Sequence, residues 1–145
     1  MTFATDMAKF CRDIAPAYVA KTIRRTVIEI GARAVERSPV GDALYWSRPA
    51  PPGYVGGRFR GNWQYGVGGA PSGELDRIDA NGSATVADIT GGVMASRASG
   101  VHYVVNNLPY AQRIEDGHSW NQAPHGIVSL LELEFPSIFE SAKRA

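Results

Sequence analysis

The sequence of 145 residues contains a single cysteine, Cys11, and three histidines. One thiol excludes an intramolecular disulfide and any CxxC metal or redox motif. The histidines, at positions 102, 118 and 125, form neither an HExxH motif nor a close pair. We therefore expect no metal and no cofactor, and we interpret Cys11 as an inert packing residue on a helix.

Long apolar runs are also absent. No stretch reaches the roughly 18 apolar residues that a membrane-spanning helix needs. The first residues lack the basic-then-apolar order of a secretory signal. Because hydrophobic residues make up 44% of the chain and charged residues 20%, the composition is typical of a soluble globular protein. We expect one domain over residues 1–145, with no membrane partner.

The small net charge of +1 hides an uneven distribution along the chain. Residues 1–73 contain ten basic and five acidic side chains, whereas residues 74–145 contain five basic and nine acidic ones. Opposite charges on the two halves suit contacts between different surfaces of two copies. The alternative is a chance distribution of solvated charges.

Apolar residues recur with helical spacing over 3–14, over 17–37 and from about 126 to the end of the chain. In the first stretch Phe3, Met7, Phe10 and Ile14 share one face, which predicts ordinary core packing. We expect Pro16 to interrupt the first two helices, Pro39 to end the second, and Pro136 to kink or divide the last.

Shorter elements fill the middle of the chain. The pattern over 83–99 predicts a helix capped by Ser83, and Pro109 is expected in the first turn of a short helix over 109–115 that Gly117 ends. Alternating side chains predict strands over 58–67 and 101–106. The predicted fold class is α+β, with long N-terminal helices and a C-terminal helix packed on a small antiparallel or mixed sheet.

The segment over residues 39–57 contains four prolines and four glycines, which exclude a helix or a central strand. It also contains more apolar side chains than a flexible linker without contacts would. We predict that it is a protruding arm that docks on a partner, and that its contacts are Leu44, Tyr45, Trp46, Tyr54 and Val55. The alternative is an Ω-loop whose aromatic side chains fold back onto the protein's own core.

Catalytic motifs are sparse. Asp116, His118 and Ser119 are near neighbours, but triads are recognised by geometry and not by adjacency. The GxSxG motif and the glycine-rich phosphate-binding motifs are missing. We predict that the protein is not an enzyme. The alternative is an enzyme that acts on the cell wall or on another polymer.

A nucleic-acid hypothesis rests on the predicted strand over 58–67. There Arg58, Arg60 and Trp63, together with Tyr65, combine cations with aromatic rings, as platforms for single-stranded nucleic acid do. A DNA-binding module is therefore the alternative function.

Two sequence blocks resemble a known family. The first is SPVGD at 38–42 with GYVGGRFRGNWQ at 53–64, and the second is NNLPYAQRIEDGHS at 106–119 with QAPHGIV at 122–128. In this order they resemble the SPV…TGRFRxNW and NNxPYAxxxExGxS…QAPxGMV blocks of the tail-completion (neck, or minor tail) proteins of tailed bacteriophages. Ile127 replaces the usual methionine of the second block, and residues 43–52 lengthen the arm.

The resemblance implies a structural α+β subunit of a homo-oligomeric ring, a hexamer or else a dodecamer. The ring lies in the virion neck between the head-connector and tail proteins, is assembled in the host cytoplasm, and lets DNA pass without sequence-specific binding. The resemblance implies no catalysis, cofactor or metal. The motif residues that it singles out, for interface contacts or for the fold itself, are Arg58, Arg60, Asn62, Trp63, Asn106, Asn107, Pro109, Tyr110, Glu115, His118 and Ser119.

Specific roles are expected for some motif residues. Asn106 and Asn107 can bond backbone groups at the end of a strand. Pro109 is expected to fix the turn that follows. Glu115 is expected to form an ion pair with an arginine such as Arg58 or Arg60.

Overall fold

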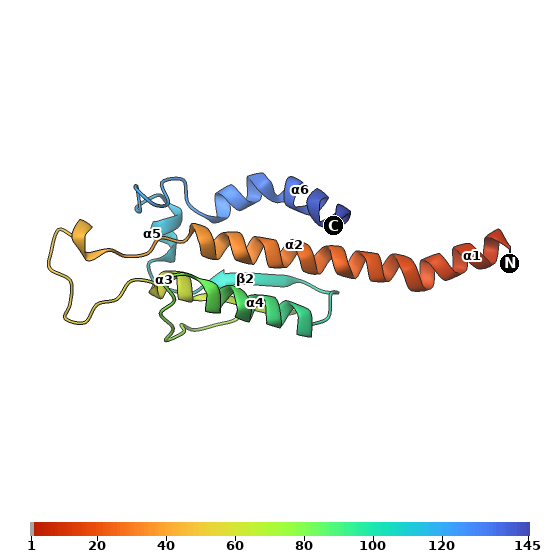
Figure 1. Cartoon of the computed structure of the whole chain (residues 1–145), viewed down its shortest axis with the longest axis horizontal. Helices are drawn as coiled ribbons and strands as arrows, with labels where there is room; N and C mark the ends of the chain where they lie inside the picture. Colours follow the sequence, from red (N-terminus) through yellow and green to blue (C-terminus); the bar gives the residue numbers. More distant parts are fainter. Residues whose placement is uncertain (1) are drawn as a thin grey trace.

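The computed structural model describes residues 2–145, with the side chain of Tyr45 outside the described part. Its N-terminal half is dominated by one helical rod (Figure 1), made of α1 (Phe3–Lys9), the π-helical residues Phe10–Ile14 and α2 (Ala15–Arg37). The prediction that Pro16 interrupts this helix is wrong. The amide of Ala15 bonds back to Phe10 in a wide π-turn, so Pro16 falls in the first turn of α2, where its missing N–H costs little. The rod ends at Arg37, as Pro39 predicts.

The sheet has two antiparallel strands, β1 (Trp63–Val67) and β2 (His102–Asn106), in which Trp63 lies opposite Asn106. The prediction of a strand over 58–67 is wrong in its first half, where the chain forms the helical turn α3 (Arg58–Gly61). The carbonyl of Gly57 accepts the amide of Gly61, and the side chain of Asn62 bonds the carbonyl of Arg58. These bonds hold the turn despite the alternating sequence.

Helices cover the rod on two sides. The C-terminal helix α6 (Val128–Arg144) and the helix α4 (Ser83–Ala95) both pack against α2, and α4 also packs against β1 (Figure 1). The core between them includes Val35, Ile89 and Ile138. The predicted α+β class is confirmed: a long N-terminal helix and a C-terminal helix pack with a two-stranded antiparallel sheet.

Several boundaries differ from those predicted. The cap of α4 is Gly82 and not Ser83, because the buried carboxylate of Asp79 accepts the amides of Gly82 and Thr85. The short helix α5 (Ala111–Glu115) begins after Pro109, which lies in the preceding turn. Gly117, at φ +86°, follows its end as expected.

Pro136 lies inside α6 without dividing it. The buried side chains of Leu131 and Ile138, on either side of the proline, both belong to the core. Packing on both sides of Pro136 therefore offsets the single backbone hydrogen bond that proline removes.

The predicted core packing of the first helix is also wrong. Phe3, Met7, Phe10 and Ile14 are between 44% and 81% exposed, and Cys11 beside them is exposed rather than packed. The rod extends past the C-terminal end of α6 (Figure 1), so no other element of the described chain covers this stretch. Periodicity shows that these side chains share a face, but it does not show what covers that face.

Candidate interface cleft

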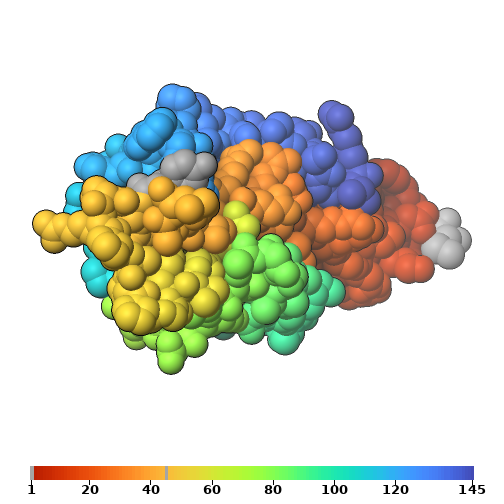
Figure 2. Space-filling view, turned by 60° about the vertical axis from the view of Figure 1, so that its left-hand side comes forward, coloured from red at the N-terminus to blue at the C-terminus, as the bar shows by residue number. Residues whose placement is uncertain are grey.

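The two sequence blocks meet at one end of the molecule. There the loop over residues 39–57 and the segment over residues 110–122 enclose a cleft of about 680 Å³. In Figure 2 the loop, orange to yellow, lies beside the light-blue segment around residue 120. Eight of the seventeen described residues that line the cleft are aromatic or cationic: Trp46, Tyr54, Arg58, Phe59, Tyr110, Arg113, His118 and Trp120.

A clamp by Gln122 holds the loop at the cleft. Its amide oxygen accepts the backbone N–H of Val40 at 2.8 Å, and its amide nitrogen donates to the carbonyl of Val40 at 3.0 Å. Further along the loop the rings of Trp46 and Tyr54 are in contact, with centroids 4.6 Å apart. The loop is therefore tied to the second block at its start, and its two limbs are joined by an aromatic contact.

The predicted contacts of the arm divide into two groups. Trp46 and Tyr54 line the cleft and remain 41% and 38% exposed. Leu44 and Val55 lie outside its lining and are more exposed still. Tyr45 is the fifth predicted contact, and its side chain lies outside the described residues.

Tyr110 forms part of the cleft wall next to Phe59, with ring centroids 6.0 Å apart. Burial raises the pKa of its phenol, an effect that the nearby Arg58 partly offsets. Arg58 itself bonds Glu74 at 2.8 Å. At neutral pH the cleft therefore presents a neutral phenol next to a paired arginine.

The geometry does not join Asp116, His118 and Ser119 into a triad. The Nδ1 of His118 lies 2.9 Å from the carbonyl oxygen of Arg113, and the carboxylate of Asp116 accepts a bond from Gln112 at 2.9 Å. No hydrogen bond links the three side chains within residues 2–145. Over the same residues there is no cluster of three or more metal-ligating side chains and no helix long and apolar enough to span a membrane.

Most residues of the first block hold the fold together. Asn62 is fully buried, donates to the carbonyls of Arg58 and Leu75, and accepts the amide of Leu75. Arg60 donates to backbone carbonyls of the α2 end and of Ala80. Trp63 is 4% exposed and donates its indole N–H to Ser38. These contacts join the end of α2, the turn α3 and the loop before α4.

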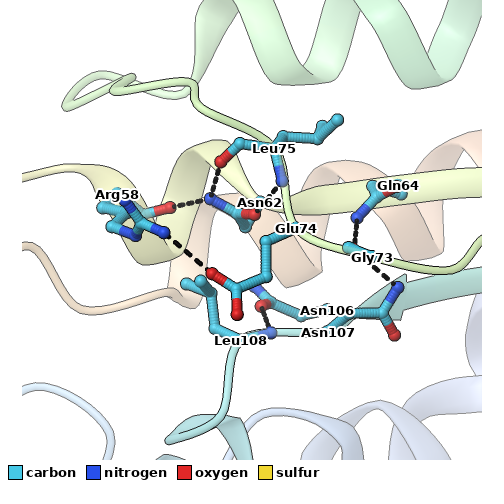
Figure 3. A network of polar contacts seen from close by, with 9 residues as sticks. All are labelled: Arg58, Asn62, Gln64, Gly73, Glu74, Leu75, Asn106, Asn107 and Leu108. Carbon is cyan, nitrogen blue, oxygen red and sulfur yellow. Dashed lines mark hydrogen bonds and ion pairs between the residues drawn. The ribbon is translucent and has the colours of Figure 1, made fainter.

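The asparagines of the second block do what was predicted of them. Asn106 donates to the carbonyl of Phe59 and accepts the amide of Leu108, while Asn107 donates to the carbonyls of Pro71 and Gly73. Figure 3 shows two of these bonds, between Asn106 and Leu108 and between Asn107 and Gly73 in the loop that follows β1. Both side chains therefore satisfy backbone groups at the end of β2.

Glu115 does not pair with an arginine, which corrects the prediction. Its carboxylate accepts the amides of Ile127, Val128 and Ser129 and the Ser129 hydroxyl, at 2.7–2.9 Å, and so caps α6. Burial raises the pKa of this carboxyl, but the four hydrogen bonds outweigh that effect and hold the pKa below its usual range. Sequence spacing did not indicate that Glu115 bonds the start of α6, because the path of the chain between α5 and α6 brings these groups together.

The residues of the predicted nucleic-acid platform do not lie together on one strand. Arg58 and Arg60 lie on α3 and not on the strand, and the ring of Trp63 is buried in the core. A stacking surface needs exposed rings beside its cations. The residues chosen for that role therefore do not share one exposed face.

Several lining residues of the cleft were not singled out as site residues from the sequence, among them Arg113, Trp120 and Gln122. Trp120, 78% exposed, lies in a polar loop between the two parts of the second block. A large aromatic residue in such a loop is itself a signal of a contact surface.

Comparisons with protein-family models, with curated proteins and with solved structures found no match to this chain.

Proposed function

We propose that this protein is a structural subunit of the neck of a tailed-bacteriophage virion, where copies form a ring that joins the head connector to the tail. The observation that carries the proposal is the convergence of the two family-like blocks. The blocks start at residues 38 and 106, which are 68 positions apart in the chain, yet both contribute to the wall of one cleft. In this proposal the cleft contacts a neighbouring head or tail protein.

The chemistry of the cleft supports a protein partner. Interface cores are enriched in tyrosine, tryptophan and arginine, and each of these residue types occurs twice among the described residues that line the cleft. The exposed indole of Trp120 and the Trp46–Tyr54 pair offer rigid aromatic anchors. Buried motif residues such as Asn62 lie outside the lining of the cleft and bond the backbone of Arg58 and Leu75, so in this proposal they hold the fold and do not touch the partner.

In the proposed ring, DNA passes through the central channel without sequence-specific contacts to its bases. The arginines of the first block support this role, because their side chains already bond to protein groups: Arg60 to backbone carbonyls and Arg58 to Glu74. Arginines held in this way are poorly placed to read base edges.

Electron microscopy of particles made without this gene tests the proposal. We expect filled heads and finished tails that are not joined, and expect the protein supplied from a plasmid to restore joined virions. Intact virions without the protein would refute the neck role.

A further inference from the structure

A second apolar surface lies away from the cleft. A groove of about 380 Å³ runs between α2, which contributes Ile30 and Ala34, and α6, which contributes Leu131 and Phe135, with Val104 of β2 also in its lining. Of the described residues that line it, Glu132 alone is charged. No ion pair to Glu132 exists within residues 2–145.

The rod presents an apolar surface of matching character. We call Phe3, Met7, Phe10 and Ile14 the N-terminal stripe. No residue between Phe3 and Ile14 is buried. The two phenyl rings, 81% and 48% exposed, leave on the order of 200–300 Å² of aromatic surface in water. Together with Met7 and Ile14 they form a patch of the size that usually marks an interaction site.

The N-terminal stripe cannot reach the groove of its own chain. The rod is helical without a break from Phe3 to Arg37, and Ile30 and Ala34 of the groove belong to the same rod. Figure 1 shows the N-terminus at the far end of the rod, beyond the end of α6. Any groove that accepts the stripe therefore belongs to another molecule.

The two surfaces have opposite net charge. Residues 3–25, which include the stripe, contain five basic and two acidic side chains. Residues 128–140 of α6 contain three glutamates and no basic residue. Glu134 already pairs with Arg33 and Arg37 of α2, and Glu140 with Lys143, so the acidic group of the groove that faces a partner is Glu132. Complementary charge favours this pairing and sets its orientation. It also makes a second copy of the chain a suitable occupant, because one chain contains both surfaces.

We propose that the N-terminal stripe of one copy docks into the α2–α6 groove of a second copy. The contact joins two different surfaces, so it repeats from copy to copy and gives either a closed ring or an open chain. The inference rests on the proposed function in taking the assembly to be a ring of copies. It adds which surfaces make the contact.

Crosslinking tests this contact, because Cys11 is the natural thiol beside the stripe. We would combine it with Glu132→Cys at the groove and treat the concentrated protein, and purified particles, with a short bismaleimide that joins two thiols. A chain with both thiols in a repeating contact is expected to give a ladder of covalent multimers on a denaturing gel. Adding Phe3→Ser and Phe10→Ser should reduce the ladder roughly tenfold or more, because two aromatic anchors are lost.

Matched variants distinguish this contact from other ways in which the stripe or the groove could be covered. Unaltered protein, and Cys11→Ser with Glu132→Cys, each have one thiol and should not form multimers beyond a dimer. Ser99→Cys places the second thiol on an exposed loop outside the groove and should give no ladder. Efficient dimers from unaltered protein would mean that two stripes face each other, and this would overturn the proposal. So would the absence of a ladder in both solution and particles, or crosslinks only to a different virion protein.

The two proposals can fail separately. Unjoined heads and tails in the deletion particles combined with no ladder would leave the neck role standing and remove this contact. A ladder combined with intact deletion particles would leave the contact standing and remove the neck role.

Discussion

At the scale of single residues, polar side chains of the two blocks mainly bond backbone groups. The amides of Asn106 and Asn107 follow a strand, and short amides in that position commonly bond nearby backbone groups, so their role could be predicted from the sequence. The role of Glu115 could not. Its partners lie twelve to fourteen residues further along the chain, and only the path of the loop between α5 and α6 brings them to it.

Replacing Glu115 by glutamine tests the cap. We expect Glu115→Gln to lower the free energy of unfolding at neutral pH by about 1–2 kcal/mol, because a charged cap of four bonds becomes a neutral one. The pKa of Glu115 is lowered in the folded state, so its contribution is fully present above the ordinary glutamate value of about 4.3 and is lost as pH falls through the folded pKa.

Denaturant unfolding at several pH values measures this effect. The difference between the two proteins should shrink below about pH 4. Asp116→Asn is the matched control, because that carboxylate accepts one exposed bond from Gln112, and it should change stability little. Equal losses of unfolding free energy in Glu115→Gln and Asp116→Asn would contradict the proposal that Glu115 caps α6.

At the scale of elements, adjacent glycines in α4 have different surroundings. A Cβ atom added to Gly92 would lie 2.9 Å from the ring of Tyr65 on β1, whereas one added to Gly91 would have no atom within 4 Å. From the sequence alone, both glycines are expected to lower the stability of the helix by the same amount. Only the packing of α4 on β1 separates them.

Alanine at each position tests this packing. Gly91→Ala should raise the free energy of unfolding by up to about 1 kcal/mol, since alanine favours the helix and meets no neighbour. Gly92→Ala should lower it by about 1 kcal/mol or more, because the clash with Tyr65 outweighs the same helical gain. Thermal unfolding followed by circular dichroism should show melting temperatures that move in opposite directions. Shifts of the same sign would show that α4 does not pack this closely.

The predicted strand over 58–67 shows a different limit at this scale. Alternation of Phe59, Trp63 and Tyr65 fits a strand, but Gly57 and Asn62 supply hydrogen bonds that close a helical turn instead. Phe59 and Trp63, which the alternation places on one face, are both buried in the structure. Hydrophobic periodicity therefore identified core residues correctly while giving the wrong local geometry.

At the scale of the whole molecule, two of the three surfaces that other chains would cover lie at its two ends, and the third is the α2–α6 groove. The cleft lies at the loop end, and the N-terminal stripe lies at the far end of the rod (Figure 1). Such a distribution suits a subunit with more than one kind of neighbour.

Combining Trp46→Ala with Tyr54→Ala tests the loop end. The two rings contact each other and are partly exposed, so their loss should leave the melting temperature within a few degrees of the unaltered protein. We expect the protein to be lost from particles, as measured by immunoblots of purified virions. Ile78→Ala removes an exposed apolar side chain outside the cleft and should be incorporated normally. Normal incorporation of the double variant would remove the loop from the interface.

The sequence by itself determined the α+β class, the end of the long helix before Pro39 and the capping amides after β2, because each depends on local spacing or on neighbouring residues. The tertiary structure alone decided that Pro16 is accommodated by a π-turn, that Glu115 caps α6 and that the N-terminal stripe stays uncovered. The last two depend on which distant segment comes to lie beside a residue, whereas the π-turn is a local rearrangement of the backbone between Phe10 and Ala15. Helical and strand periods show which side chains share a face, but contacts between distant segments decide whether that face is buried or left for a partner.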